Sequence, residues 1–491
     1  MARPAIQTKY GGLRGVVSRD GAVVSYKGIP FAQPPVGELR FAPPRPPIPW
    51  EGELICDGFR PACIQPARRG FGGGPAKRFW MSEDCLYLNI WTPAHATAED
   101  KLPVMLWIYG GGFVGGRTAE PEMDGAALAG QGVILVTCAY RCGPLGFFAL
   151  NELAQRVGAD GPRNLGLLDQ IAALEWIHDN ISAFGGDPDN ITLFGQSAGG
   201  MSTRMLLCAP PTKGLIRRVI VHSGGGLNEG DPVRPTAEME EICKQVLAHL
   251  GWTADDLMSR DASEVTAKLL EASKAVASHE LHLFQPFIDG YSIIDVPGKL
   301  IKEGKFPENV SLMCGTVSGD SWMFSRKVRP QLGGDEQALR AFACSPAVAW
   351  ARVQNINGRV PLYGYFFEHL RPGQTAVRTP DGAAALLAPH GSEIAYAFGN
   401  LDCGDDRTDF AWTEYDYTLS DAMVRYWTNF ARTGDPNGDG LPLWTPYTPD
   451  APRVMNFRDD GWDMRDVVDN PKAEHVIQFT IDHPGMLEKF E

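Results

Sequence analysis

Short apolar runs recur along the first half of the chain and alternate with a stretch of helical spacing. Four runs rich in Val, Ile and aromatic residues are 104–109, 133–138, 191–194 and 219–221. Apolar runs without polar alternation predict strands buried on both faces, which is typical of a parallel sheet. Residues 165–184 carry Leu and Ile at intervals of three or four positions, which predicts an amphipathic helix. Strands alternating with helices predict an α/β fold with right-handed crossovers.

The regions on either side of this alternation follow other patterns. Roughly the first 60 residues are rich in Gly, Pro and Val at hairpin-like spacing, and they predict an antiparallel start to the sheet. Residues 235–305 become helical, mainly over 239–250 and 262–277, and predict a helical insertion over the sheet. No flexible linker or internal repeat divides the chain. We therefore expect residues 1–491 to form a single domain, although the length alone suggests about three.

Composition excludes several classes of protein. The 55 Gly and 38 Pro residues exclude a long-helix architecture. With 45 basic and 59 acidic residues the formal net charge is −14, which repels nucleic acid and anionic lipid, so neither is an expected partner. No stretch approaches about 18 consecutive apolar residues, so no membrane span is expected. The first residues lack an apolar segment of signal-peptide length. We expect a soluble protein, either cytoplasmic or exported with a signal removed.

The sharpest chemical signal is the pentapeptide Gly195-Gln196-Ser197-Ala198-Gly199, which follows the third apolar run and precedes a helical stretch. A serine on a tight strand-to-helix turn projects its hydroxyl above the sheet, and the residues two positions away must be small. The next backbone N–H lies at a helix N-terminus, where it can stabilise an oxyanion. This context favours a nucleophilic serine over a structural glycine turn.

A second glycine cluster, residues 110–116, follows the first apolar run. Gly110, Gly112 and Gly115 match the G-x-G-x-x-G fingerprint of dinucleotide-binding proteins, which also requires an acidic residue about 20 positions on, at the end of the next strand. Residues 138–141 contain no carboxylate there. The alternative is a loop whose bare N–H groups bind an oxyanion beside a nucleophile. We favour the oxyanion loop over dinucleotide binding and over a plain turn.

A serine nucleophile needs a base and an orienting acid, which α/β-hydrolases supply in the order Ser, acid, His. The histidines beyond residue 300 are His369, His390, His475 and His483. His390 is in a loop before the helical stretch 394–398, which is a suitable place to present an imidazole. Spacing by itself does not choose among these histidines or among the many candidate acids.

Two longer segments carry a family resemblance. Residues 83–91, Glu-Asp-Cys-Leu-Tyr-Leu-Asn-Ile-Trp, resemble a signature of the type-B carboxylesterases, the family that includes the cholinesterases and bacterial p-nitrobenzyl esterases. Residues 194–200 resemble the nucleophile signature of the same family. The similarity extends from residues 28–37 to residues 429–437. It implies an α/β-hydrolase fold with a large, mostly parallel central sheet flanked by helices, and with helical insertions covering an active-site gorge.

The resemblance also implies roles for individual residues. Ser197 resembles the nucleophile, and His390, in a segment similar to the family's His-x-x-Glu stretch, resembles the base. Asp320 takes the place of the family's acid, which is usually Glu; because Asp is one methylene shorter, closing the triad requires a small shift of the loop or the imidazole. Glu393 is the rival acid near His390 in sequence, but in the family its position is structural. The positions that match the family's oxyanion-hole donors are Gly111, Gly112 and Ala198.

Departures from the cholinesterases bear on the substrate. Gln196 stands where cholinesterases have Glu, so a cationic substrate meets no negative charge there. Residues 64–82 show no counterpart of the choline-stacking Trp, and residue 323 is Met where cholinesterases place an aromatic residue; a cation–π site needs such faces. We therefore expect poor selectivity for choline esters. The apolar residues expected to shape the substrate pocket are Phe113, Phe287, Met323 and Phe324.

The resemblance implies one disulfide and a short loop. Cys63 and Cys85 resemble the family's first disulfide, whose loop forms part of the gorge wall and, in lipases, the lid. Here the loop is short and rich in Gly, which favours an esterase over a true lipase. Its four basic residues are Arg68, Arg69, Lys77 and Arg78. A solvated rim is the simpler interpretation of this charge, and recruitment of anionic esters is the alternative.

Other candidates are structural or lack the required spacing. Two ion pairs that resemble pairs of the family correspond here to Arg40–Glu83 and Arg141–Asp169. Residues 435–440 imitate the start of a calcium loop, but the twelfth position is Pro446 instead of Glu. The segment 279–282 lacks the HExxH spacing, and no Cys/His cluster supports zinc. We expect neither a metal nor a cofactor.

The sequence thus predicts a serine carboxylesterase that acts through an acyl-enzyme on Ser197, with broad specificity toward small or medium neutral esters. Lipase, thioesterase or amidase activity on the same triad is the alternative within this class. A non-catalytic binding protein is the alternative outside it, because cholinesterase-like domains also serve in adhesion. Such domains typically lose the serine or the histidine, whereas every position here is chemically competent. The expected partner is a small-molecule ester, and the expected state is a monomer or weak oligomer.

Overall fold

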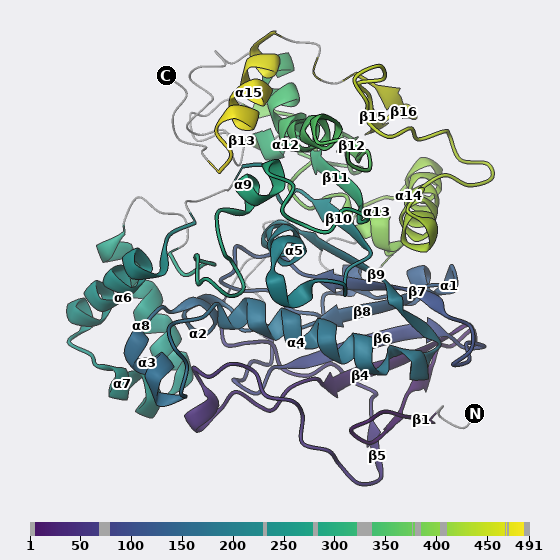
Figure 1. The fold of residues 1–491 in the computed structure, drawn as a ribbon. Coiled ribbons are helices and arrows are strands. Elements are labelled where there is room, and N and C mark those ends of the chain that lie inside the picture. Colours follow the sequence, from purple (N-terminus) through teal and green to yellow (C-terminus); the bar gives the residue numbers. More distant parts are fainter. Residues whose placement is uncertain are drawn as a thin grey trace.

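A central sheet forms the core of the computed structural model, which describes residues 5–67, 79–228, 233–277, 283–321, 336–375, 377–378, 384–402, 410–466, 468 and 471–485 (Figure 1). In these ranges the sheet has eleven strands, in the order β16-β15-β12-β11-β10-β9-β7-β8-β6-β4-β3. They are β3 (Val16–Val17), β4 (Val23–Pro30), β6 (Tyr87–Pro93), β7 (Leu102–Ile108), β8 (Ile134–Cys138), β9 (Gly186–Gln196), β10 (Arg218–His222), β11 (Ser311–Val317), β12 (Tyr363–Phe367), β15 (Val454–Arg458) and β16 (Gly461–Arg465).

The middle of this sheet is parallel, as predicted. Neighbouring strands from β8 through β7, β9, β10, β11 and β12 to β15 all pair in parallel. Every residue of β8 and β10 is buried, and because successive side chains point to opposite faces, both faces of the sheet are covered. The four predicted apolar strands therefore correspond to β7, β8, β9 and β10, with β9 beginning earlier than its apolar run, at Gly186.

The two ends of the sheet are antiparallel. The pairs β3–β4, β4–β6 and β6–β8 are antiparallel, which confirms the antiparallel start predicted for the N-terminal region. Strand β16 closes the opposite end antiparallel to β15. Outside the main sheet, β1 (Ala5–Gln7), β2 (Gly12–Arg14) and β5 (Glu53–Ile55) form a small sheet, and β13 (Val377–Arg378) pairs with β14 (Ala384–Ala385).

The helix predicted over residues 165–184 is present as α4 (Leu165–Asn180) and the 3₁₀ turn η3 (Ile181–Phe184). It is not amphipathic, so that part of the prediction was wrong. Twelve of the sixteen residues of α4 are buried, including the polar Asp169 and Gln170. The reason is that α4 packs on β9 while α2 (Gly143–Phe147) and α5 (Ala198–Cys208) pack on α4, so little of its surface meets water.

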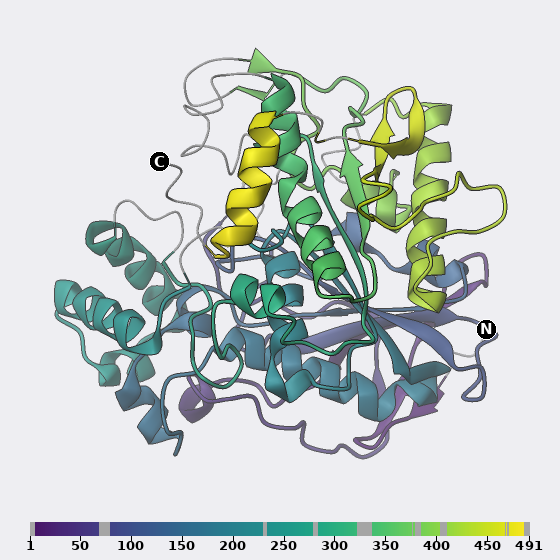
Figure 2. The same ribbon diagram turned by 45° about the horizontal axis from the view of Figure 1, so that its top comes forward.

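The predicted helical insertion consists of α6 (Thr236–Leu250), α7 (Ala254–Ser259) and α8 (Ala262–Val276), followed by α9 (Pro297–Lys302). Helices α6 to α8 gather at one side of the molecule, near α2 and α3 (Asn151–Arg156), and α8 contacts α2 directly (Figures 1 and 2). They lie beside the sheet and not over its middle, whereas α9 contacts α5. The helical character was predicted correctly and the placement only in part.

The remaining helices complete the layers around the sheet. Helix α12 contacts β11 and β12 and lies side by side with α15, green and yellow in Figure 2. Helix α14 packs on α13 and contacts β7 and β9. These elements are α1 (Ala126–Gly130), α12 (Glu336–Ile356), α13 (Ile394–Phe398), α14 (Glu414–Thr433), α15 (Pro471–Asp482) and the 3₁₀ turns η1 (Gly37–Leu39), η2 (Pro121–Met123) and η4 (Pro210–Thr212).

Both ion pairs implied by the resemblance are formed. The guanidinium of Arg141 binds both carboxylate oxygens of Asp169, at 2.7 and 2.9 Å, and also donates to the carbonyl of Ala42 at 2.8 Å. Both side chains are at most 2 % exposed, so this pair joins the end of β8 to α4 inside the core. Arg40 binds both carboxylate oxygens of Glu83, at 2.5 and 2.9 Å, and this pair is largely buried.

Cys63 and Cys85 are brought together as two buried thiols, and the structure has no disulfide between them; the resemblance implies this pairing for an oxidising environment. The sulfur of Cys63 has a second neighbour, because the backbone N–H of Cys142 donates to it at 3.3 Å. Hydrogen bonds from the thiols of Cys142 and Cys85 lower the pKa of Cys63, and the contact with Cys63, together with burial, raises the pKa of Cys85. The thiol of Cys142 therefore lies beside the two cysteines, Cys63 and Cys85, that the resemblance pairs.

We predict that replacing Asp169 with Ala lowers the free energy of unfolding by about 3–5 kcal/mol, because the guanidinium of Arg141 is left buried without its counter-ion. Urea denaturation followed by tryptophan fluorescence measures this change. Glu271→Ala removes the exposed partner of Lys268 and serves as the control, with little expected change. Equal losses in the two variants would contradict the importance of the buried pair.

We predict that Cys63 pairs with Cys85 when the chain is refolded in a glutathione buffer of oxidising poise. Thiol titration of the denatured protein should then find eight thiols, two fewer than the ten cysteines of the sequence. The Cys63→Ser variant should keep all nine remaining thiols. A count of ten in the oxidised protein, or peptide mapping that joins Cys63 to Cys142, would contradict this pairing.

Candidate active site

Ser197 occupies a strained turn between β9 and α5. Its φ of 57° and ψ of −126° lie in a region that residues with a side chain rarely adopt. Its backbone N–H donates to the carbonyl of His222 at 2.9 Å. A Cβ on Gly199 would lie 2.0 Å from the carbonyl oxygen of Ile108, so the turn can close against β7 only with glycine at that position. Ser197 is partly exposed although the residues on both sides of it are buried.

Asp320 and His390 meet at the carboxyl end of β11. The Nδ1 atom of His390 lies 2.6 Å from Oδ1 of Asp320, and both residues are buried. The second oxygen of Asp320 accepts the backbone N–H of Val317 at 3.2 Å. The structure therefore brings together the predicted acid and base, and the shorter Asp side chain reaches the imidazole directly.

The loops of the acid and the base are bonded to each other. Ala388, two residues before His390, donates its N–H to Ser318 Oγ at 2.9 Å and accepts the N–H of Gly319 at 2.9 Å. Ala388 on the loop of His390 is thus joined by two hydrogen bonds to Ser318 and Gly319 on the loop of Asp320. This arrangement limits how far the imidazole can move from its acid.

The electrostatic environment of His390 favours its protonated form. Burial alone lowers the pKa of this imidazole, but the negative charge and hydrogen bond of Asp320, with a contribution from Glu393, outweigh it. The pKa of His390 therefore lies above its ordinary value of 6.5. A base with a raised pKa accepts a proton more readily from a serine hydroxyl.

Sequence reasoning did not foresee where the side chain of Gln196 lies. Its Nε2 is 2.9 Å from Nε2 of His390. Because Asp320 accepts the proton on Nδ1, Nε2 of the neutral imidazole carries a lone pair, and the amide can donate to it. The only sequence signal for this contact is that Gln196 directly precedes Ser197. Neighbouring residues of a regular strand point to opposite faces, so the sequence alone does not place both side chains near His390.

The glycine cluster after β7 lies against the nucleophile. A Cβ on Gly110 would come within 2.8 Å of the Cβ of Ser197. Gly111 and Gly112 follow with φ of 124° and 62°, conformations that glycine adopts easily. The next helical turn is η2, so the cluster is not the strand-to-helix turn that binds a pyrophosphate. Ala198, the remaining predicted donor, is the first residue of α5.

The other histidine candidates are engaged elsewhere or exposed. His369 is held between Asp416 and Asp459, each 2.7 Å away. His475 and His483 are exposed on α15 and just after it. Of the four late histidines, His390 is the one that the structure places beside the predicted acid.

The predicted pocket residues fall into two groups. Phe113 and Phe287 are both 1 % exposed, and Phe113 packs edge-to-face on Phe147 with ring centroids 5.4 Å apart. Met323 and Phe324 lie outside the described residues, as do the basic residues Arg68, Arg69, Lys77 and Arg78. Among the described residues, no group of three or more His, Cys, Asp or Glu side chains could hold a metal ion. No helix in these ranges has the length and apolar character needed to cross a membrane.

The chain is similar to a known protein family over most of its length. The model of the family described as "Carboxylesterase family" matches residues 2–344 and 336–476. Para-nitrobenzyl esterase of Bacillus subtilis (strain 168) is 33% identical over 482 residues, covering 91% of this chain and 93% of that protein. The medium-chain fatty acyl-CoA hydrolase precursor of Anas platyrhynchos is 32% identical over 515 residues, covering 91% of this chain and 87% of that protein.

Solved structures of esterases share the whole fold. A PNB esterase structure superposes with a TM-score of 0.80 at 31% identity, covering 96% of this chain and 99% of that one. A carboxylesterase of Geobacillus stearothermophilus gives a TM-score of 0.74 at 30% identity, covering 97% and 100%. The predicted α/β-hydrolase fold is confirmed. On the extent of these matches and on the family model, the chain belongs to the carboxylesterase family and is a carboxylic ester hydrolase.

Proposed function

We propose that this carboxylesterase hydrolyses small and medium neutral esters through an acyl-enzyme on Ser197, with His390 as the base and Asp320 as the orienting acid. The observation that carries the proposal is the buried 2.6 Å contact between His390 and Asp320 beside a strained serine. Asp320 accepts the Nδ1 proton, so the imidazole holds the tautomer whose Nε2 can take a proton. Ser197, Asp320 and His390 follow one another along the chain in the order nucleophile, acid, base, which is typical of the fold.

The first half of the reaction forms the acyl-enzyme. The oxygen of Ser197 bonds to the ester carbonyl carbon, its proton passes to Nε2 of His390, and the carbonyl electrons become an oxyanion. The N–H groups of Gly111, Gly112 and Ala198 are proposed to bind this oxyanion, and one such donor typically contributes ~3 kcal/mol in the transition state. Collapse of the oxyanion then expels the alcohol, which takes the proton from His390.

The second half releases the acid. Water attacks the acyl carbonyl and gives its proton to Nε2 of His390, and the new oxyanion collapses to break the bond to the serine oxygen. Ser197 recovers its proton from the imidazolium, and the carboxylic acid leaves. Before the reaction the amide of Gln196 is hydrogen-bonded to Nε2 of His390. This bond must break when the serine transfers its proton, because the amide and the proton use the same lone pair of Nε2.

A neutral substrate fits the charge of the site. Gln196 contributes no charge, and the carboxylate of Asp320 is engaged by His390 and the backbone of Val317. Two of the relatives have names that specify a substrate: a para-nitrobenzyl esterase and a medium-chain fatty acyl-CoA hydrolase precursor. The second name makes medium-chain thioesters the other candidate substrate class. Oxygen esters are the first choice because the solved structures that share most of this fold are esterases.

We predict that Ser197→Ala lowers kcat on p-nitrophenyl acetate by on the order of 10⁶-fold, as expected when a serine nucleophile is removed. Release of p-nitrophenol is measured across acyl chains of rising length, with circular dichroism showing that the variant is folded. Activity that survives the substitution refutes the mechanism. A preference for long emulsified chains, for acyl-CoA over the matched oxygen ester, or severalfold for acetylcholine over a size-matched neutral ester, would overturn the proposed substrate class.

We predict that the acid limb of the pH profile of kcat/KM has its midpoint above pH 6.5. The active base is neutral His390, whose pKa is raised, so activity is lost as the pH falls through that pKa. Asp320→Asn removes the carboxylate charge, which should move the midpoint to lower pH and lower kcat by about 10⁴-fold. A midpoint that stays in place in this variant would exclude Asp320 as the partner of the base.

A further inference from the structure

A second histidine–carboxylate pair lies behind the proposed triad. His222, the last residue of β10, and Glu393, just before α13, are both 0 % exposed. The Nδ1 atom of His222 lies 3.4 Å from Oε1 of Glu393. Among the described residues, neither Nδ1 of His222 nor either carboxylate oxygen of Glu393 has a hydrogen-bond partner, so this close contact is the one between the two side chains. The proposed triad uses neither side chain.

The proton of His222 is directed toward Glu393 by a third residue. The indole Nε1 of Trp427, on α14, donates to Nε2 of His222 at 2.9 Å. An indole nitrogen can only donate, so Nε2 must keep its lone pair, and the proton of the neutral ring is on Nδ1. The rings of Trp107 and Tyr365 each pack edge-on against His222, with centroids 5.8 Å away. The ring of His222 is therefore held in one orientation, with Nδ1 facing the carboxylate of Glu393.

His222 and Glu393 join the two halves of the active site. The backbone carbonyl of His222 accepts the N–H of Ser197 at 2.9 Å, while its side chain faces Glu393. Glu393 is three residues after His390, on the same loop. One residue thus contacts the turn of the nucleophile through its backbone and the loop of the base through its side chain.

We propose that His222 and Glu393 are positioning residues for the catalytic base: His222 ties the loop of His390 to the turn of Ser197, and Glu393 places a second buried negative charge near the imidazole. This inference rests on the proposed function, because it concerns the same triad. Its consequence is that two carboxylates, Asp320 and Glu393, stabilise the imidazolium that forms when the serine is deprotonated.

The charged and titratable groups around the pair are consistent with this role. Asp320 approaches His390 from the turn after β11, and Glu393 adds to its effect in raising the pKa of His390. Tyr365, on β12, stays a neutral phenol because burial and then the charge of Glu393 raise its pKa. Arg371 donates to the carbonyl of Ser392 at 2.9 Å and so brings a positive charge to the same loop.

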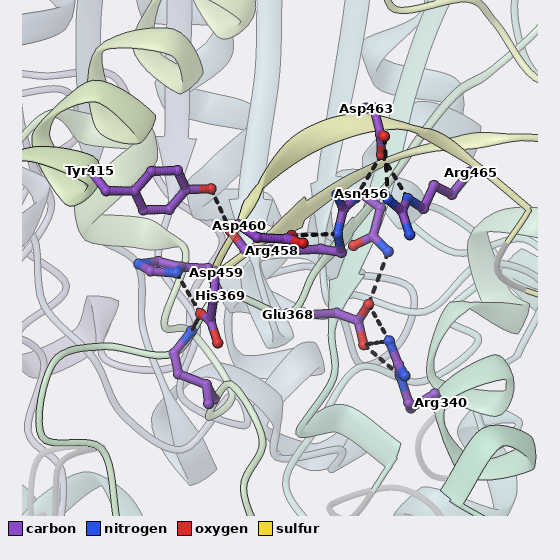
Figure 3. A network of polar contacts seen from close by, with 11 residues as sticks. Arg340, Glu368, His369, Tyr415, Asn456, Arg458, Asp459, Asp460, Asp463 and Arg465 are labelled. Atoms are coloured by element: carbon purple, nitrogen blue, oxygen red, sulfur yellow. Dashed lines mark hydrogen bonds and ion pairs between the residues drawn. The ribbon is translucent and has the colours of Figure 1, made fainter.

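A purely structural pair is bonded differently elsewhere in the chain. His369 contacts Asp459 with one ring nitrogen and Asp416 with the other, and Figure 3 shows the first of these contacts within a larger polar network. Asp416 also accepts hydrogen bonds from Tyr396 and Thr413, whereas Glu393 has a single long contact. A buried carboxylate with so few partners costs folding stability. The His369 network is the matched control for a role in folding alone.

The test compares Glu393→Gln with His369→Gln in the full-length enzyme. Removing the charge of Glu393 should move the acid limb of kcat/KM to lower pH and lower kcat on the order of tenfold, less than the about 10²–10⁴-fold supplied by the base itself. KM for a neutral ester should stay unchanged. His369→Gln should lower the melting temperature and leave the acid limb in place. If Glu393→Gln does not fold, Glu393→Asp, which retracts the carboxylate by one methylene, should give a smaller shift in the same direction.

Substitutions of His222 test the geometric half of the proposal. His222→Gln keeps a donor toward Glu393 and an acceptor for Trp427, so it should retain most of kcat. His222→Leu keeps neither and should lose kcat to about the same extent as Glu393→Gln. Equal loss in the Gln and Leu variants would overturn the role of the donor.

The burst of p-nitrophenol at high enzyme concentration separates this inference from the proposed function. Ser197→Ala should abolish the burst, and a burst that persists would refute the acyl-enzyme on Ser197. In Glu393→Gln the burst should still reach one equivalent, because the nucleophile is intact, with a slower rate. If the triad passes this test but the acid limb of Glu393→Gln coincides with that of the parent enzyme, the positioning role is overturned and the proposed function stands.

Discussion

The site depends on the backbone of Ser197, which is held at a positive φ by contacts with the strands on both sides of β9. Strand β9 lies between β7 and β10, so the turn that follows it meets β7 at Gly199 and receives the carbonyl of His222 from β10. Such a conformation costs of order 1–3 kcal/mol and persists only where the surroundings determine it. The surroundings here are the buried parallel strands, whose packing offsets this cost.

The other segments of the site, namely the glycine cluster and the loops of Asp320 and His390, are arranged around the turn of Ser197. The glycine cluster lies against it because Gly110 has no side chain, and the proposed acid follows β11, which is the next strand beyond β10. The proposed base, His390, is the last of these residues in the sequence, on a loop bonded to the loop of Asp320 through Ala388. Residues separated by almost 200 positions thus meet at the carboxyl ends of adjacent parallel strands, which is where such sheets place their chemistry.

Charge inside the site is arranged around a single imidazole. Asp320 and Glu393 are both buried carboxylates, while His222 is neutral and Gln196 is an amide. Asp320 and Glu393 both favour a proton on His390 and so raise its pKa, against the effect of burial. The proposed reaction needs such an arrangement, because its transition state develops positive charge on the imidazole and negative charge on the substrate oxygen.

Local sequence patterns were a reliable guide to the central strands and to the turn around Ser197. The apolar runs correspond to parallel strands, and the pentapeptide around Ser197 forms the expected turn. The pattern misled where several layers meet: α4 shows helical spacing, but other helices cover the face expected to meet water. The cysteines show a second limit, because nothing in the spacing of Cys63 and Cys85 indicates that the thiol of Cys142 lies beside them.

The sequence by itself determined the strand-turn-helix around Ser197, the glycine cluster after β7 and, through the family resemblance, the acid and base, because each depends on short segments with little conformational choice. Only the tertiary structure decided which side chains surround His390. Gln196, His222 and Glu393 belong to three separate segments, and their contacts depend on strand order and side-chain direction. No local pattern encodes such contacts, because they arise when parallel strands from distant parts of the chain end side by side.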